Sequence, residues 1–162
     1  PITKVKTIEK LKEFKIVQGI GWLDTDILRK NGFKVSTGAS YKGLFKMVAL
    51  GRADLFGRGA NEILEEYKNN KEVKDLVVDE SIALYYPLPR FFFTNKKNIQ
   101  AIKRISKGLI SAYNDGAIQK VWEIHYGPSL KFVNFKKRTI FKVDNPFLEG
   151  VSNAYEAFIY HP

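Results

Sequence analysis

The chain has no cysteine, so it forms no disulfide framework and no thiolate metal site. No apolar run approaches the ~20 residues that a membrane-spanning helix needs, and no secretion signal is recognisable after Pro1. The sequence also lacks a P-loop, a dinucleotide fingerprint and a Ser-His-Asp order. Its two histidines, His125 and His161, have no clustered acidic partners, so we expect no metal site and no cofactor.

What is present is typical of a folded domain. With 162 residues, 44% hydrophobic content and 14% aromatics, the chain is long and apolar enough for a core. Its net charge of +10 fits an acidic ligand, an anionic surface, nucleic acid or simply a solvated surface. The basic residues are dispersed along the chain and do not cluster around a known nucleic-acid-binding motif. Nucleic-acid binding is therefore the least favoured of the candidate functions, and we expect no nucleic-acid partner.

Residues 41–62 give the clearest local pattern in the chain, a helix, a strand and the start of a second helix. Ser40 is a plausible cap for a helix over 41–50, and a short strand over 53–56 follows. Gly57-Arg58-Gly59 then leads into a second helix over 60–69. Ligands of open α/β sheets bind at the carboxyl ends of strands, where helix N-termini favour anions. Arg58 is therefore the first candidate for contact with an anionic group, and a structural ion pair is the alternative.

Strand-like and helix-like segments alternate through the first half of the chain. Strands are expected at 15–18, 33–36, 53–56 and 76–78, with helices between them, which predicts an α/β fold with a parallel sheet. Two aromatic runs at 81–86 and 90–94 flank Pro87-Leu88-Pro89 and suggest a hinge or crossover segment.

The second half is expected to be helical and then extended. Asn95 is expected to cap a long amphipathic helix that breaks at Asp115-Gly116. A second helix follows and is expected to end at Tyr126-Gly127-Pro128, with a mostly extended tail after it.

The order of these segments resembles bacterial solute-binding proteins of family 3, which have the type 2 periplasmic-binding fold. The resemblance is carried by the stretches at 19–28, 31–35, 41–62 and 84–93, and by 105–108 together with 114–118. It implies a parallel-sheet lobe over 1–84, and the return crossover, closing helices and C-terminal tail of the partner lobe over 85–162. The N-terminal part of that partner lobe has no counterpart here, so the apolar face of the 97–113 helix would lack a partner surface and favour self-association.

The resemblance also implies a function. Such proteins capture a small polar solute in the periplasm, as the substrate-binding component of an ABC-type uptake system or a sensor, and present it to a membrane permease without doing chemistry. Relatives that bind amino acids usually carry an acidic residue where this chain has Gly59; Glu62, about one turn later, is the candidate substitute. The absence of that residue disfavours standard amino acids and favours an anionic or otherwise different small metabolite, so the expected ligand is small and polar, either anionic or amino-acid-like. An enzyme on the same fold, such as a dehydratase of a cyclic carboxylic acid with Glu62 as its acid, is the alternative.

The candidate ligand-binding residues come from the turn after the first strand, the turn after the third strand and the crossover. They are Gly21, Trp22, Asp24, Thr25, Arg58, Gly59, Asn61, Glu62 and Tyr86. Several have structural alternatives: Asp24 or Thr25 as a helix cap, Trp22 as a core residue and Glu62 as a first-turn residue beside the helix dipole.

Overall fold

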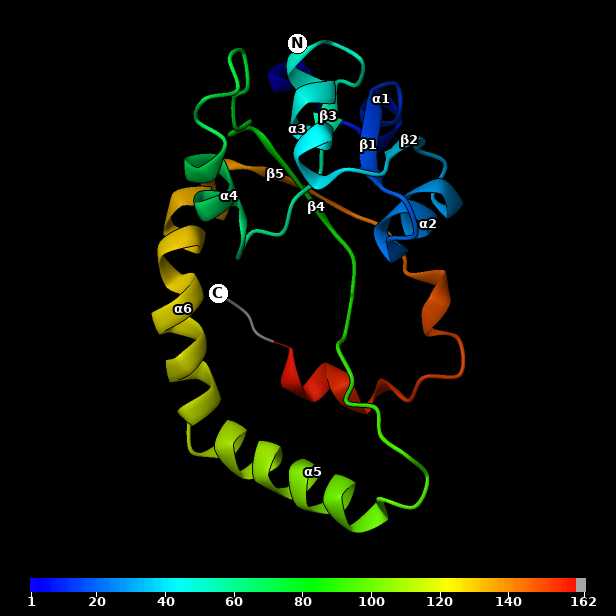
Figure 1. The fold of residues 1–162 in the computed structure, drawn as a ribbon, viewed down its shortest axis with the longest axis vertical. Coiled ribbons are helices and arrows are strands. Elements are labelled where there is room, and N and C mark those ends of the chain that lie inside the picture. The colour runs from blue at the N-terminus through cyan, green and yellow to red at the C-terminus, as the bar shows by residue number, and fades with distance from the viewer. Residues whose placement is uncertain (160–162) are drawn as a thin grey trace.

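The computed structural model describes residues 1–159 and contains two small parallel sheets with helices around them (Figure 1). The first sheet has the order β2-β1-β3. Its strands are β1 (Lys15–Gly19), β2 (Lys34–Gly38) and β3 (Leu55–Phe56). Ile16 lies opposite Val35 on one side and Leu55 on the other. The predicted α/β alternation with a parallel sheet is therefore confirmed for these three strands.

Helices α1 (Ile8–Lys12), α2 (Leu23–Lys30) and α3 (Tyr41–Ala49) accompany this sheet. The α3 helix begins as predicted, because the Ser40 hydroxyl accepts a hydrogen bond from the Gly43 amide. Its Leu44 packs with Val17 and Ala53 in one of two hydrophobic clusters. Burial of this face fixes α3 against the sheet and so directs the chain into β3 and the turn that carries Arg58.

The predicted fourth strand at 76–78 does not form. After α4 (Ile63–Asn69) the backbone turns at Asp75, whose φ is 63°, and continues as an irregular segment. Neither described sheet includes this short apolar run, and Val77 is 80% exposed. The run at 90–94 is also without strand structure; it follows two prolines, which lack the N–H that a sheet ladder requires.

The second sheet joins segments that are far apart in sequence. It pairs β4 (Ile82–Tyr85) with β5 (Thr139–Lys142), in parallel. The tail was predicted to be mostly extended, and its extended part includes the strand β5, whereas 3₁₀ segments occur at 146–148 and 153–158. Phe141 of β5 also packs in the same hydrophobic cluster as Leu11 and Ile16, so the N-terminal sheet and the tail share a core.

Two long helices connect β4 to β5. They are α5 (Ile99–Asn114) and α6 (Ala117–Val133). The break between them lies at Asp115-Gly116 as predicted, but α5 begins at Ile99 rather than next to Asn95. The predicted end of α6 near Gly127 is wrong, because the helix continues through Pro128. Burial of Ser129 and Val133 offsets the hydrogen bond that the proline removes, and Asn134, with φ of 50°, ends the helix.

The remaining chain consists of short 3₁₀ segments. They are η1 (Ile2–Lys4), η2 (Phe135–Lys137), η3 (Pro146–Leu148) and η4 (Asn153–Phe158). Among the helices that the structure describes, none is long and apolar enough to cross a membrane.

Candidate functional site

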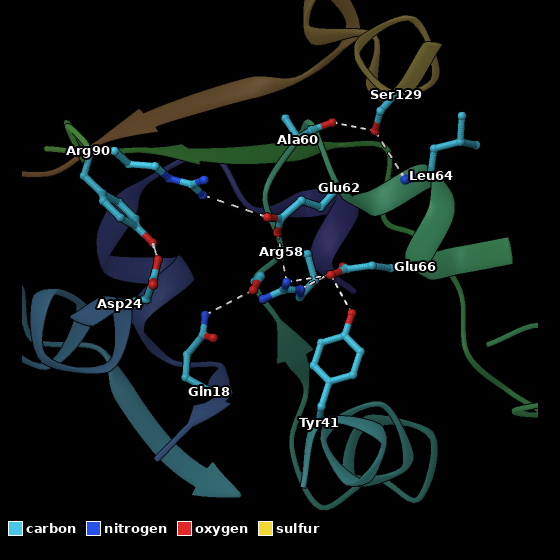
Figure 2. A network of polar contacts seen from close by, with 12 residues as sticks. Gln18, Asp24, Tyr41, Arg58, Ala60, Glu62, Leu64, Glu66, Arg90 and Ser129 are labelled. Carbon is cyan, nitrogen blue, oxygen red and sulfur yellow. Dashed lines mark hydrogen bonds and ion pairs between the residues drawn. The ribbon is translucent and has the colours of Figure 1, made fainter. Parts of the chain in front are cut away.

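The loops that follow β1 and β3 meet at the carboxyl edge of the first sheet. Gln18, at the end of β1, donates a hydrogen bond from Nε2 to the carbonyl of Gly57, 3.1 Å away, in the turn after β3 (Figure 2). This contact holds together the two turns that carry most of the candidate residues. Adjacent parallel strands end at the same sheet edge, so the fold itself produces this convergence.

Trp22 lies immediately before α2 and packs beside the Arg58 side chain. It stacks on Phe56 of β3, with ring centroids 6.2 Å apart. A Cβ on Gly19 would lie 2.2 Å from the indole ring, so glycine at that position is what admits Trp22 to the site. The central carbon of the Arg58 guanidinium lies 5.1 Å from the centroids of both the Trp22 and Phe56 rings, and 5.7 Å from that of Tyr41. The guanidinium is therefore enclosed by aromatic faces, which attract a cation.

Arg58 also has carboxylate partners at the N-cap of α4 and within it, Glu62 and Glu66 (Figure 2). Its Nε and Nη2 donate to the two oxygens of Glu66 at 2.7 and 2.6 Å, and Nη2 also donates to Glu62 at 2.9 Å. The side chains of Arg58 and Glu66 are only 14% and 12% exposed. Burial by itself lowers the pKa of the Arg58 guanidinium, but the hydrogen bonds and charges of Glu66 and Glu62 raise it above its usual value. Arg58 therefore forms a structural ion pair, which the sequence analysis gave as the alternative to ligand contact.

Tyr41 completes this cluster from the first turn of α3. Its hydroxyl donates to Glu66 at 2.6 Å. Burial, followed by this hydrogen bond and the charge of Glu66, raises the pKa of Tyr41 from 10.0 to about 12. Glu66 therefore accepts hydrogen bonds from two residues that lie in different parts of the chain, and it fixes both.

Glu62 has the most accessible carboxylate in the cluster, with 40% of its side chain exposed. A Cβ built on Gly59 would lie 3.1 Å from Oε2 of Glu62 and 2.8 Å from Oδ1 of Asn61. The carboxylate of Glu62 therefore occupies space that a side chain at position 59 would fill. Arg90 approaches Glu62 at 4.0 Å from the crossover segment, but its side chain is 85% exposed and holds little in place.

Tyr86 and Asp24 form a second contact across the site. The Tyr86 hydroxyl donates to the Asp24 carboxylate, so the crossover is tied to the first turn of α2. Burial, then this hydrogen bond and the charge of Asp24, raise the pKa of Tyr86. A hollow of ≈ 360 Å³ borders this region and is lined by Tyr86 and Arg90 together with residues of η4. Arg58 is not among its lining residues.

The remaining candidate ligand-binding residues lie in the turn after β1 and the first turn of α2, beside the Arg58 cluster. Thr25 is buried, and its hydroxyl donates to the Gly19 carbonyl at 3.0 Å, so it supports the turn and does not face a ligand. Gly21 has a φ of 77° in that turn and is exposed. Neither Asp24 nor Thr25 caps α2, because Trp22 occupies the N-cap position. His161 lies outside the described residues, within which no cluster of potential metal ligands occurs.

The sequence reasoning missed Glu66, Tyr41 and Gln18. Glu62 and Glu66 lie four residues apart and so on one helix face, and Arg58 lies four residues before Glu62; this spacing was a usable signal. Comparison of the chain with protein-family profiles, with curated proteins and with solved structures finds no match. The function must therefore be argued from the chemistry of the site.

Proposed function

We propose that the chain is a solute-binding protein with the type 2 periplasmic-binding fold, which captures a small amino-acid-like ligand in the periplasm. In this role it serves an ABC-type uptake system or a sensor and carries out no chemistry itself. The observation that supports the proposal is the meeting of Trp22, Arg58 and Glu62, from two separate turns, at the carboxyl edge of a parallel sheet.

The charges in the cluster favour a zwitterion over a simple anion. Within the buried part of the cluster one guanidinium, that of Arg58, faces two carboxylates, and the second cation, Arg90, approaches Glu62 only at 4.0 Å from an 85% exposed position. The hydrogen bonds of Arg58 to other described residues use Nε and Nη2, which leaves Nη1 for a ligand carboxylate. Glu62, the exposed carboxylate, is in turn suited to a ligand ammonium group, in place of the acidic residue that is absent at Gly59.

The alternative of a dehydratase requires Glu62 to act as a proton donor. Its carboxylate already pairs with the Arg58 guanidinium at 2.9 Å, and this contact gives that alternative no support. We therefore retain solute capture as the proposed function.

Thermal-shift and calorimetric titrations of the purified chain test this function. The panel contains amino acids, the matched carboxylic acids without an amino group and the matched amines. We expect amino acids to raise Tm, because binding to the folded state alone stabilises it. Glu62→Gln should weaken amino-acid binding at least tenfold and leave binding of the matched carboxylic acids unchanged.

Glu65→Gln is the matched control, because Glu65 is 69% exposed and pairs with Lys68 rather than Arg58. Its ligand affinities should equal those of the parent chain. No stabilisation by any member of the panel would contradict the proposed function. Equal losses for Glu62→Gln and Glu65→Gln would remove Glu62 from the site.

A further inference from the structure

The α5–α6 arm, defined here as residues 99–133, and the segment 86–98 before it expose much apolar surface. Every residue of α5 is at least partly exposed. Phe91, Phe92 and Phe93 are 50%, 68% and 90% exposed. The exposed apolar side chains of the two helices include Ile99, Ile105, Leu109, Ile110, Val121 and Ile124. Surface of this kind, spread over adjoining elements, marks an interaction site.

The total surface area gives the scale of what is uncovered. The chain exposes 11546 Å². A compact monomer of this mass exposes about 8,200 Å² by the scaling of area with mass. The excess of about 3,300 Å² is larger than the about 1,000–2,500 Å² that each chain contributes to an obligate dimer. The chain as a whole therefore exposes more surface than a stable dimer interface needs, and the arm and the segment before it carry many of its exposed apolar side chains.

The apolar and basic residues of α5 lie on different faces. At 3.6 residues per turn, Ile99, Ile102, Ile105, Leu109, Ile110 and Tyr113 form one stripe. Arg104 and Lys107 lie on the other side of the helix, and Lys103 lies beside the edge of the stripe, about 20° from Ile110. No acidic residue occurs between Glu80 and Asp115. Two copies can therefore bring their apolar stripes together while their basic residues point outward.

The apolar stripe continues into a hollow at the bend between α5 and α6. This hollow has a volume of ≈ 310 Å³ and is lined by Ala112 together with α6 residues such as Val121 and Trp122. Tyr113, at the same end of α5, packs against Phe158 with ring centroids 4.9 Å apart. Such a hollow can accept an apolar side chain that protrudes from a partner surface.

We propose that the occupant of this surface is a second copy of the chain, with the two α5 helices packed antiparallel about a two-fold axis. A two-fold interface is self-complementary, so each contact occurs twice. The α5 helix of 16 residues is about 24 Å long. Antiparallel packing then places Phe91–Phe93, just before the start of one helix, beside the hollow at the end of the other. By symmetry, Phe91–Phe93 of each copy then fill the hollow of the other copy. The interface is used up in the dimer, so no further copies add to it.

Sedimentation and light scattering of the full chain test the stoichiometry. We expect a mass twice the 18.6 kDa of one chain, with dissociation on dilution. Phe93→Ser and Leu109→Glu should each weaken dimerisation at least tenfold. Both side chains are exposed in the single chain, so circular dichroism should show unchanged folding. Val77→Ser, which removes an 80% exposed apolar side chain outside the arm, is the control and should leave the dimer intact.

Cysteine cross-linking tests the arrangement of the helices. The chain has no cysteine, so each substitution introduces a single thiol. Ser106 lies within the apolar stripe near the middle of α5, whereas Ser111 points about 140° away from Ser106 and lies outside the stripe. Under mild oxidation we expect Ser106→Cys to form a disulfide-linked dimer and Ser111→Cys to remain monomeric on denaturing gels.

Four outcomes would overturn the proposal. They are a monomer at all concentrations, open-ended aggregates without a defined mass, equal cross-linking of the two cysteine variants, and a monomer that floats with vesicles of anionic lipid. The last would assign the arm to a membrane surface instead. Ligand binding at Glu62 is measured separately, so failure of the dimer leaves the proposed function untouched.

Discussion

Glu66→Gln is the substitution that tests most directly how the site is held together. Glu66 accepts two hydrogen bonds from Arg58 and one from Tyr41, on a side chain that is 12% exposed. Glutamine keeps the shape and one acceptor oxygen, but its amide group is a donor and faces the donors of the guanidinium. The variant therefore removes the charge and part of the hydrogen bonding, with little change in volume.

The expected cost is about 2–3 kcal/mol. Hydrogen bonds to charged groups contribute about 1.5–3 kcal/mol, and removal of one partner of a fully buried ion pair costs about 3–5 kcal/mol. We take the lower part of this range, because Glu62 still neutralises Arg58 and neither side chain is fully buried. For a domain of this size each kcal/mol shifts Tm by about 2–4 °C. Glu66→Gln should therefore lower Tm by about 4–12 °C.

Urea unfolding and calorimetry measure this effect. Glu65→Gln is again the control, because its exposed pair with Lys68 is worth about 0.5 kcal/mol or less. The slope of the unfolding free energy against urea concentration, the m value, should be the same in both variants as in the parent chain, since the surface exposed on unfolding is the same. If Glu66→Gln were no more destabilising than Glu65→Gln, the cluster around Arg58 would not stabilise the fold and the reasoning would be refuted.

Three further predictions concern single residues of the site and its support. Because the pKa of Tyr41 rises from 10.0 in the unfolded chain to about 12 in the fold, its contribution to stability is complete below pH 10 and lost as pH rises to 12; Tyr41→Phe should remove this component from the pH dependence of Tm. Ser129→Ala leaves two backbone groups at the start of α4 without a partner, and denaturant unfolding should show a loss of about 1–3 kcal/mol. Gly19→Ala should displace Trp22, cost about 1–3 kcal/mol and change tryptophan fluorescence; an unchanged spectrum would contradict the close contact between them.

Several local features followed from the sequence because short-range chemistry controls them. Ser40 caps α3 as expected, since the cap needs only a hydroxyl three residues before a free amide. The Asp54 carboxylate, just before β3, accepts a hydrogen bond from the Lys15 amide at 2.7 Å and so joins two adjacent strands. The three strands of the first sheet also formed where apolar runs alternate with helical periodicity.

Pairing over long sequence distances was not predictable in the same way. The run at 76–78 has the composition of a strand, but a strand exists only where a neighbour supplies hydrogen bonds. The neighbour of β4 comes instead from residues 139–142, more than fifty positions later. Similarly, Pro128 predicted a helix end, and only the packing of Ser129 against the Ala60 carbonyl and the Leu64 amide explains why α6 continues.

The sequence by itself determined the class of fold, the position of Arg58 in a turn after a strand and the amphipathic character of α5, since each depends on residues close together in the chain. The tertiary structure decided which groups meet Arg58. Glu66, Tyr41 and Trp22 come from three different elements, and the spacing of residues along a chain does not fix distances between elements. The charge balance at the site, and with it the expected ligand class, is for that reason a property of the folded chain.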